Sequence, residues 1–292
     1  MTATTAKVEK YHSMKKAKRR STIIYHTIVS ILSFLMLYPL FWMVSSSFKP
    51  NTEIFVNVTS LIPIDFTLEN YITGWKGFAE LSFGVFFKNS FVVSGVAMLG
   101  STISAAVCAF GFARLRFPGR NIWFVAMIIT MMLPGQVMMI PRFVMFNKMG
   151  WVGTFLPLTV PAFFGGAFDI FLIMQFIRGI PRDMDEAARI DGCSWYGIFF
   201  YIIIPMIVPA LVTVAVLSFI GSWGDFMGSL LYLNKPQYYT SAYALKLFAD
   251  AAFTDYGATF AMSTISLIPI LTIFFFFQKN LVEGISIQGL KG

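Results

Sequence analysis

Charged residues are scarce in this chain. Only 12% of its 292 residues are Asp, Glu, Lys or Arg, whereas 57% are hydrophobic. Soluble domains carry about 25% charged residues, and the mean hydropathy here is +0.72. The composition therefore excludes an ordinary soluble domain and indicates a protein embedded in a membrane, whose many aromatic side chains serve as lipid-facing and interfacial surface.

Catalytic and nucleotide-binding motifs are also missing. The sequence has no G-x-x-x-x-G-K-[ST], no H-E-x-x-H and no G-x-S-x-G segment, so it cannot hold a nucleotide phosphate in the P-loop manner. The two histidines, His12 and His26, lie in or beside a basic N-terminal segment and are too few for a metal site or a proton relay. We expect no enzyme activity, no bound cofactor and no metal. The energy for any conformational change of the chain is therefore expected to come from another protein.

Carboxylates and thiols are rare in the apolar part of the chain. Asp169 and Asp225 are the only clear intramembrane carboxylates, and they belong to different segments. A carrier driven by protons would usually have more ionisable groups there. Cys108 falls in an apolar segment and Cys193 in a charged loop, so no disulfide is expected.

What the sequence does contain is a series of long apolar runs. A helix needs about 20 apolar residues to cross a bilayer. The third and fourth runs contain Pro134-Gly135 and Gly165-Gly166, which are either ordinary kinks in packed helices or hinge and pathway positions. The runs predict an all-α integral membrane protein with six transmembrane helices, at 22–47, 84–113, 121–145, 152–177, 199–223 and 258–278.

The positive charges indicate the orientation of these helices. Residues 1–21 are rich in Lys and Arg, and the apolar run that follows is too long for a signal peptide. With this segment in the cytoplasm, most Lys and Arg residues of the loops and tails lie on the cytoplasmic side, as the positive-inside rule requires. We therefore expect both termini to be cytoplasmic, and residues 1–21 to form a basic tail that binds no nucleic acid.

The predicted spans divide the rest of the chain. Residues 22–83 hold the first transmembrane helix and a long external loop, residues 84–281 hold a core of five transmembrane helices, and residues 282–292 form a cytoplasmic tail. The external loops at 48–83 and 230–257 are long enough to contain short structured pieces and to meet an extracytoplasmic partner.

A charged, amphipathic loop at 178–198 separates the fourth and fifth predicted spans. Pro181 can begin a helix with an acidic first turn, and Gly192 can end that helix in a left-handed conformation. Ser194 can then cap a second helix that begins at Trp195. The loop is either a stiff helix-elbow-helix knob that docks on a soluble partner or a plain interfacial amphipathic loop.

Residues in and after this loop follow a spaced pattern. Glu186-Ala187-Ala188 is followed by Asp191-Gly192, with glycine at the fourth position after Ala188, and then by Ile204-Pro205. The pattern resembles the EAA loop of binding-protein-dependent ABC importer permeases, with Ile204 in place of the usual Leu before Pro205.

Two further stretches carry the resemblance over essentially the whole chain from 22 to 292. Residues 222–226, Ser-Trp-Gly-Asp-Phe, are similar to a stretch at the end of the fifth span of carbohydrate importer permeases, although Gly224 stands where Asn is usual. The C-terminal residues 277–279, 284–285 and 289–292 are similar to the tail of the maltose-type second permease subunit.

The resemblance implies a fold, a function and partners. The fold is the six-helix core of type I (MetI-like) importers in the bacterial cytoplasmic membrane. The function is that of a permease subunit of an ATP-driven importer for a sugar or oligosaccharide, with a non-sugar solute as the alternative. The partners are a second, homologous permease subunit in a heterodimer, two ABC ATPase subunits that bind ATP and Mg, an extracytoplasmic solute-binding protein and the lipid bilayer.

The resemblance also implies residue roles. In the loop, Glu186 would make polar contact with the ATPase, Ala187 and Ala188 would pack closely, and Gly192 would form the elbow, with Asp191 and Pro205 completing the docking and coupling site. Trp223, Gly224 and Asp225 are candidates for the translocation path. The alternative is that Trp223 belongs to an interfacial aromatic belt and that Asp225 faces water or caps backbone groups.

Overall fold

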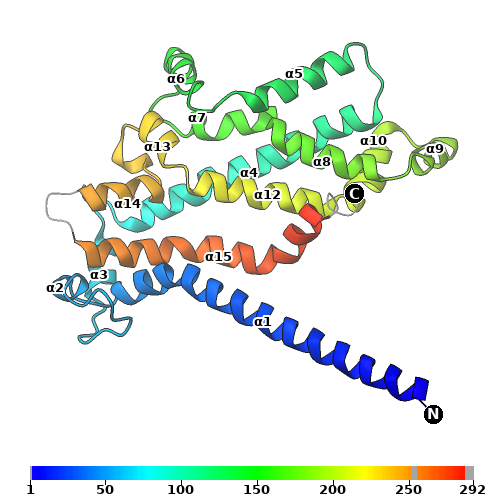
Figure 1. The fold of residues 1–292 in the computed structure, drawn as a ribbon. Helices are drawn as coiled ribbons and strands as arrows, with labels where there is room; N and C mark the ends of the chain where they lie inside the picture. The colour runs from blue at the N-terminus through cyan, green and yellow to red at the C-terminus, as the bar shows by residue number, and fades with distance from the viewer. Residues whose placement is uncertain (1, 251–254, 287–292) are drawn as a thin grey trace.

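The computed structural model describes residues 2–250 and 255–286 (Figure 1). The regular elements in these residues are helices, and their single β-contact is an isolated bridge between Phe78 and Leu81. The predicted all-α architecture is therefore confirmed.

The longer helices, in chain order, are α1 Thr2–Ser46, α3 Glu69–Lys76, α4 Phe83–Arg114, α5 Arg120–Met132, α6 Met139–Lys148, α8 Ala167–Gly179, α9 Asp183–Ile190, α12 Val208–Trp223, α13 Phe226–Tyr232, α14 Ser241–Asp250 and α15 Tyr256–Ser286. The short ones are α2 Asn51–Ile54, α7 Leu156–Thr159, η1 Val160–Phe164, α10 Trp195–Gly197, the π-helical η2 Ile198–Ile203, α11 Ile204–Met206 and η3 Pro236–Tyr238.

In the part of the chain that the structure describes, four helical segments are long and apolar enough to cross a membrane: Lys18–Ser46, Phe83–Arg114, Leu156–Gly179 and Tyr256–Leu281. They coincide with the first, second, fourth and sixth predicted spans. The first of them begins inside α1, which continues without a break through the basic N-terminal segment. Of the C-terminal stretches that resemble the permease tail, residues 277–279 and 284–285 belong to α15, whereas residues 289–292 lie outside the described residues.

The other two predicted spans are not straight helices. The fifth is a pair of helical segments, Trp195–Met206 and Val208–Trp223, bent by 77°. Pro205 and Pro209 flank the bend, and a proline removes a helix hydrogen bond and disfavours helical backbone in the residue before it. The third predicted span is two short helices, α5 and α6, because Pro134-Gly135 interrupts the apolar run. Six uninterrupted spans are therefore not found among residues 2–250 and 255–286.

The core of the bundle is built around α4, which contacts α8, η1 and α12. One face of α4 carries small side chains and lies close to its neighbours. A Cβ added to Gly100 would lie 2.6 Å from the ring of Phe163. Small side chains let helices in a membrane approach closely. The buried core cluster includes Ala105, Ala106, Ala109, Phe110 and Ala113 of α4 with Ile173, Met174, Ile177, Ile198, Ile203, Ile207, Ala210 and Val214.

Hydroxyl groups of α4 also form hydrogen bonds to the residues around Gly165-Gly166, where the helical chain is interrupted before α8. Ser101 Oγ donates a hydrogen bond to Asp169 Oδ2 at 2.5 Å, and Ser104 Oγ donates to the carbonyl of Ala162 at 3.0 Å. Gly165 between these contacts has φ +81. Asp169, which was singled out as an intramembrane carboxylate, therefore ties the Gly165-Gly166 break to α4.

The predicted external loop 48–83 is ordered by buried polar groups. The Lys49 side chain is fully buried, and its Nζ donates to the Ser60 carbonyl at 2.6 Å. The Glu53 carboxylate accepts from the backbone N–H of Ile64 and of Asp65. The loop therefore contains structured pieces, as predicted, with α2 and α3 among them.

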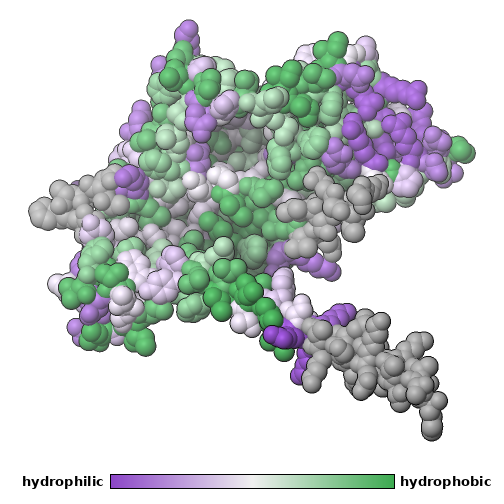
Figure 2. Space-filling model, in the orientation of Figure 1, coloured by the Kyte–Doolittle hydropathy of each residue, from purple (hydrophilic) through white to green (hydrophobic). Residues whose placement is uncertain are grey.

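Much of the outer surface of the bundle is apolar (Figure 2). Met36 of α1 is 78% exposed and Phe276 of α15 is 77% exposed, and α5 has no buried residue. A soluble protein rarely exposes such extended apolar surface. The lipid bilayer and partner subunits can cover it, which agrees with a membrane-embedded chain.

Candidate functional site

The loop between α8 and α12 is a compact projection at one end of the bundle (Figure 1). Its first helix, α9, begins two residues after Pro181 and has Asp183, Asp185 and Glu186 in its first turn. These carboxylates lie where the helix dipole favours negative charge. The sequence therefore determines locally where α9 starts.

Gly192 ends this first helix. Its φ is +83, a left-handed conformation that glycine adopts without strain. The N–H of Cys193 donates to the carbonyl of Ala188 at 2.9 Å, which is the long bond of a Schellman motif. Ser194 then caps α10 by accepting from the N–H of Gly197 at 3.2 Å. The predicted left-handed glycine and the predicted cap are both present.

The predicted coupling residues lie mainly on the outside of this projection. Glu186, Ala187, Asp191 and Gly192 are exposed, whereas Ala188 packs partly against the core cluster of α4 and α8. Pro205 is exposed as well, but it belongs to the bend before α12 and not to the tip. Large apolar side chains add to the exposed surface, and Ile190 is 87% exposed. A partner of complementary shape can therefore contact the backbone, the carboxylates and the apolar side chains of this projection at the same time.

The base of the projection is fixed by a buried ion pair that the sequence patterns did not single out. Arg114 Nε lies 2.8 Å from Asp185 Oδ2, and both side chains are almost fully buried. Arg114 Nη2 donates to the carbonyl of Ile180 at 2.8 Å, and Arg182 donates to the carbonyl of Ala113 at 3.3 Å. Burial raises the pKa of Asp185, although Arg114 and Arg182 oppose this shift. The start of α9 is thus anchored to the end of α4.

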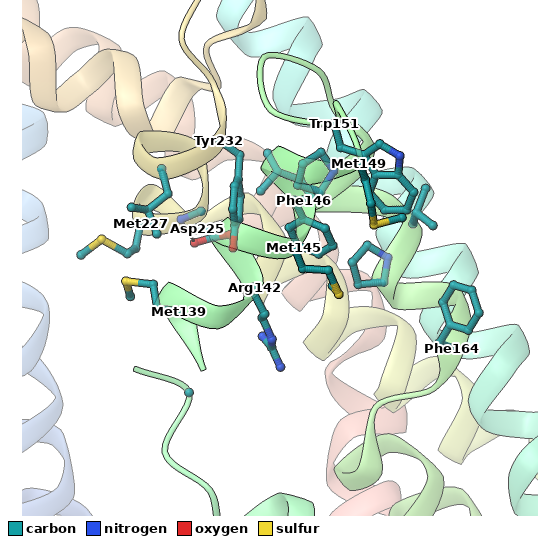
Figure 3. A pocket seen from close by; sticks show the side chains of 17 residues that line it. Met139, Arg142, Met145, Phe146, Met149, Trp151, Phe164, Asp225, Met227 and Tyr232 are labelled. Atoms are coloured by element: carbon teal, nitrogen blue, oxygen red, sulfur yellow. Dashed lines mark hydrogen bonds between the residues drawn. The ribbon is translucent and has the colours of Figure 1, made fainter. Parts of the chain in front are cut away.

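A cavity of about 570 Å³ lies at the other end of the bundle, between α6, the α7–η1 segment and α13 (Figure 3). Its lining is aromatic and Met-rich with few polar groups, which is typical of small-molecule sites. The labelled lining residues are Met139, Arg142, Met145, Phe146, Met149, Trp151, Phe164, Asp225, Met227 and Tyr232.

Ring contacts and a backbone hydrogen bond fix the aromatic residues of the cavity wall. The rings of Phe146 and Trp151 stack with centroids 5.4 Å apart, and Tyr232 meets Phe146 edge-on at the same distance. The N–H of Gly153 donates to the Tyr232 carbonyl at 2.7 Å. Burial raises the pKa of Tyr232, so its hydroxyl stays protonated and can donate a hydrogen bond.

The structure separates the three residues that were predicted for the translocation path. Trp223 is buried, packs on Phe91 and Phe219, and donates from Nε1 to the Ser266 carbonyl at 3.1 Å. Gly224 directly follows Trp223, the last residue of α12, and is the C-cap of that helix. Asp225 lines the cavity, and its Oδ1 also caps α13 by accepting from the N–H of Gly228 at 2.8 Å. Only Asp225 of the three therefore reaches the cavity.

The cap gives Asp225 a testable structural role. Asp225→Ala is expected to lower stability by about 1 kcal/mol because the N–H of Gly228 loses its acceptor. Asp225→Asn retains a side-chain oxygen and is expected to unfold near the wild-type temperature. Thermal melting of the purified protein in detergent checks this, and equal losses in the two variants would contradict the capping role.

Comparisons with known proteins agree with this geometry. Residues 101–287 match the family described as binding-protein-dependent transport system inner membrane components. A probable ABC transporter permease protein of Bacillus subtilis is 33% identical over 97% of the chain and 95% of its own length. The arabinooligosaccharides transport system permease protein of Halalkalibacterium halodurans is 31% identical over 94% of the chain and 100% of its own length.

A solved structure shares the fold. It belongs to a bacterial ABC transporter involved in the import of the acidic polysaccharide alginate. One chain of that structure superimposes with a TM-score of 0.79 at 21% identity, over 90% of this chain and 97% of that one. At this identity the similarity establishes the arrangement of helices only.

Proposed function

The chain belongs to the family of binding-protein-dependent transport system inner membrane components, and we propose that it is a permease subunit of an ATP-driven importer for a sugar or oligosaccharide. The observation that carries this proposal is the projection at residues 181–198. It presents α9, the left-handed Gly192 and α10 outside the bundle while its base is pinned to a helix long enough to span the membrane.

This arrangement suits transmission of force. The tip is exposed, so a soluble subunit can contact Glu186, Ala187 and Asp191. The base is joined through Arg114 to α4, which is packed against α8 and α12. A displacement imposed on α9 therefore reaches the central helices of the bundle through buried contacts rather than through a flexible loop.

The proposal includes an energy source and partners, and membership of the family supports them. The sequence has no P-loop, so we assign ATP and Mg to two separate ABC ATPase subunits, one of which binds the 181–198 loop. A second, homologous permease completes the path, and an extracytoplasmic solute-binding protein delivers the solute to the external loops at 48–83 and 230–257. Both termini are then cytoplasmic.

A sugar is favoured as the solute by two kinds of observation. Relatives along the whole chain are named for oligosaccharide transport, including arabinooligosaccharides and galactooligosaccharides. The cavity beside Asp225 combines aromatic faces with a carboxylate, a guanidinium and a phenol, and these groups suit sugar rings and hydroxyls through apolar contact and hydrogen bonds. A non-sugar solute is the alternative.

Co-purification and uptake test the proposal together. The tagged chain is expected to bring down a second multi-span subunit and an ATPase, and cells lacking the chain are expected to lose uptake of the solute that the cognate binding protein retains. If the chain purifies alone and its deletion leaves that uptake unchanged, the permease assignment fails. If the retained solute is an amino acid or an inorganic ion, only the sugar assignment fails.

A further inference from the structure

A second pocket, at the end of the bundle that carries α9, is lined by arginines. Arg114 ends α4, Arg120 begins α5, Arg178 lies in the last turn of α8, and Arg182 directly precedes α9. The pocket has a volume of about 410 Å³, large enough for a small polar group. We call it the arginine pocket.

Most of this positive charge is not neutralised within the described residues. The one ion pair found there joins Arg114 to Asp185. Arg120 donates to the carbonyl of Phe112, Arg182 donates to the carbonyl of Ala113, and the Arg178 guanidinium lies 5.4 Å from the ring centre of Phe124. Carbonyls and a ring face orient these guanidinium groups but leave their charge in place. The pocket therefore favours an anion.

Guanidinium groups suit one class of anion especially well. Their planar forks bind phosphate oxygens through paired, charge-assisted hydrogen bonds. The four arginines reach the pocket from three helix ends and one linker, so a phosphate has donors on several sides. The chemistry of the arginine pocket is thus that of a phosphate site.

The surroundings of the pocket distinguish a lipid from a soluble phosphate. Beside Arg120, α5 exposes Ile122 by 75% and Trp123 by 64%. Figure 2 shows a hydrophilic surface at this end of the molecule that borders the hydrophobic surface of α5. Tryptophan is enriched where the hydrocarbon core of a bilayer meets its headgroups. The pocket therefore lies at headgroup level, with an apolar helix face leading away from it.

We propose that the arginine pocket binds the phosphate of an anionic phospholipid, whose acyl chains lie along the exposed face of α5. The lipid bridges α5, the end of α8 and the base of the 181–198 loop. A soluble phosphate compound shares the headgroup chemistry but does not contact α5.

Native mass spectrometry of the purified transporter complex, titrated in detergent with phosphatidylglycerol, tests this. The wild-type complex is expected to bind phosphatidylglycerol more tightly than phosphatidylcholine with the same acyl chains. The double variant Arg178→Gln/Arg182→Gln is expected to raise the Kd for phosphatidylglycerol about tenfold or more. Glycerol phosphate, which has no acyl chains, is expected to bind far more weakly than the lipid.

Arg189→Gln is the matched control. Arg189 stacks on Trp195 with its guanidinium carbon 5.0 Å from the ring centre and does not line the pocket, so its removal should leave the Kd unchanged. If the double variant does not assemble, Arg178→Gln alone is used, with Arg178→Lys retaining the charge. Equal affinity in wild type and variant, or equal affinity for the two lipids, overturns the proposal. Glycerol phosphate binding as tightly as the lipid overturns the lipid assignment.

Discussion

Gly192→Val is expected to reduce solute uptake and the stimulation of ATP hydrolysis by loaded binding protein at least tenfold, while the complex still assembles. Gly192 has φ +83, and a left-handed conformation costs an ordinary residue about 1–2 kcal/mol, and a β-branched one more. A Cβ at Gly192 would meet no atom within 4 Å. Within this chain the expected defect therefore comes from the backbone, because valine redirects the chain between α9 and α10.

Two variants isolate this cause. Gly192→Asn is expected to retain most activity, because asparagine tolerates the left-handed region. Gly111→Val adds the same side chain within the helix α4, where φ is negative and a Cβ again meets nothing within 4 Å, and it should behave as wild type. ATPase stimulation and uptake are measured on complexes shown to contain all subunits. Normal stimulation and uptake in Gly192→Val would remove the coupling role from this turn.

Arg114→Met is expected to destabilise the chain by about 3–5 kcal/mol, because it leaves the Asp185 carboxylate buried without its partner. The double variant Arg114→Met/Asp185→Leu removes both charges and should recover most of this loss. Asp185→Asn should be milder than Arg114→Met, because the amide oxygen can still accept a hydrogen bond from Arg114, and Arg114 also keeps its bond to the carbonyl of Ile180. Thermal unfolding of the purified complex ranks the variants. A double variant as unstable as Arg114→Met would show that the pair does not explain the loss.

The effect of Arg114→Met should also depend on pH in a fixed direction. Burial raises the pKa of Asp185, and Arg114 opposes that shift, so removing Arg114 raises the pKa further. A carboxyl whose pKa is higher in the folded state contributes stability below its unfolded pKa, and this contribution is lost as the pH rises through the folded pKa. The melting temperature of Arg114→Met should therefore lie further below wild type at about pH 8 than at about pH 5. A constant difference would mean that Asp185 does not titrate in this range.

The Arg114–Asp185 pair has two possible roles, which one variant can separate: transmitting movement from α9 to α4, or only stabilising the chain. If the Arg114–Asp185 contact carries movement from α9 to α4, Arg114→Met/Asp185→Leu should recover thermal stability without recovering full coupling. If the pair only holds the chain together, stability and uptake should recover together. Measuring both on the double variant separates transmission from simple support.

Local chemistry explains what the sequence determined by itself. Apolar runs with enough residues to cross a bilayer as a helix predicted the spans, and four of these spans are found as long apolar helices. Gly192 and Ser194 were predictable because a left-handed turn and a helix cap depend on the residue at that position and its immediate neighbours. The spacing of Glu186, Gly192 and Pro205 pointed to the family because the loop is continuous in sequence.

The tertiary structure decided features that depend on residues distant in sequence. The carboxylate of Asp185 faces Arg114 only because α4 and α8 pack side by side, and the arginine pocket exists because helix ends meet. Trp223 lies in the core and Asp225 lines the cavity because the helix α12 ends before Asp225. Hydropathy and motif spacing act along the chain, whereas burial and ion pairing are set by neighbours that only the folded bundle brings together.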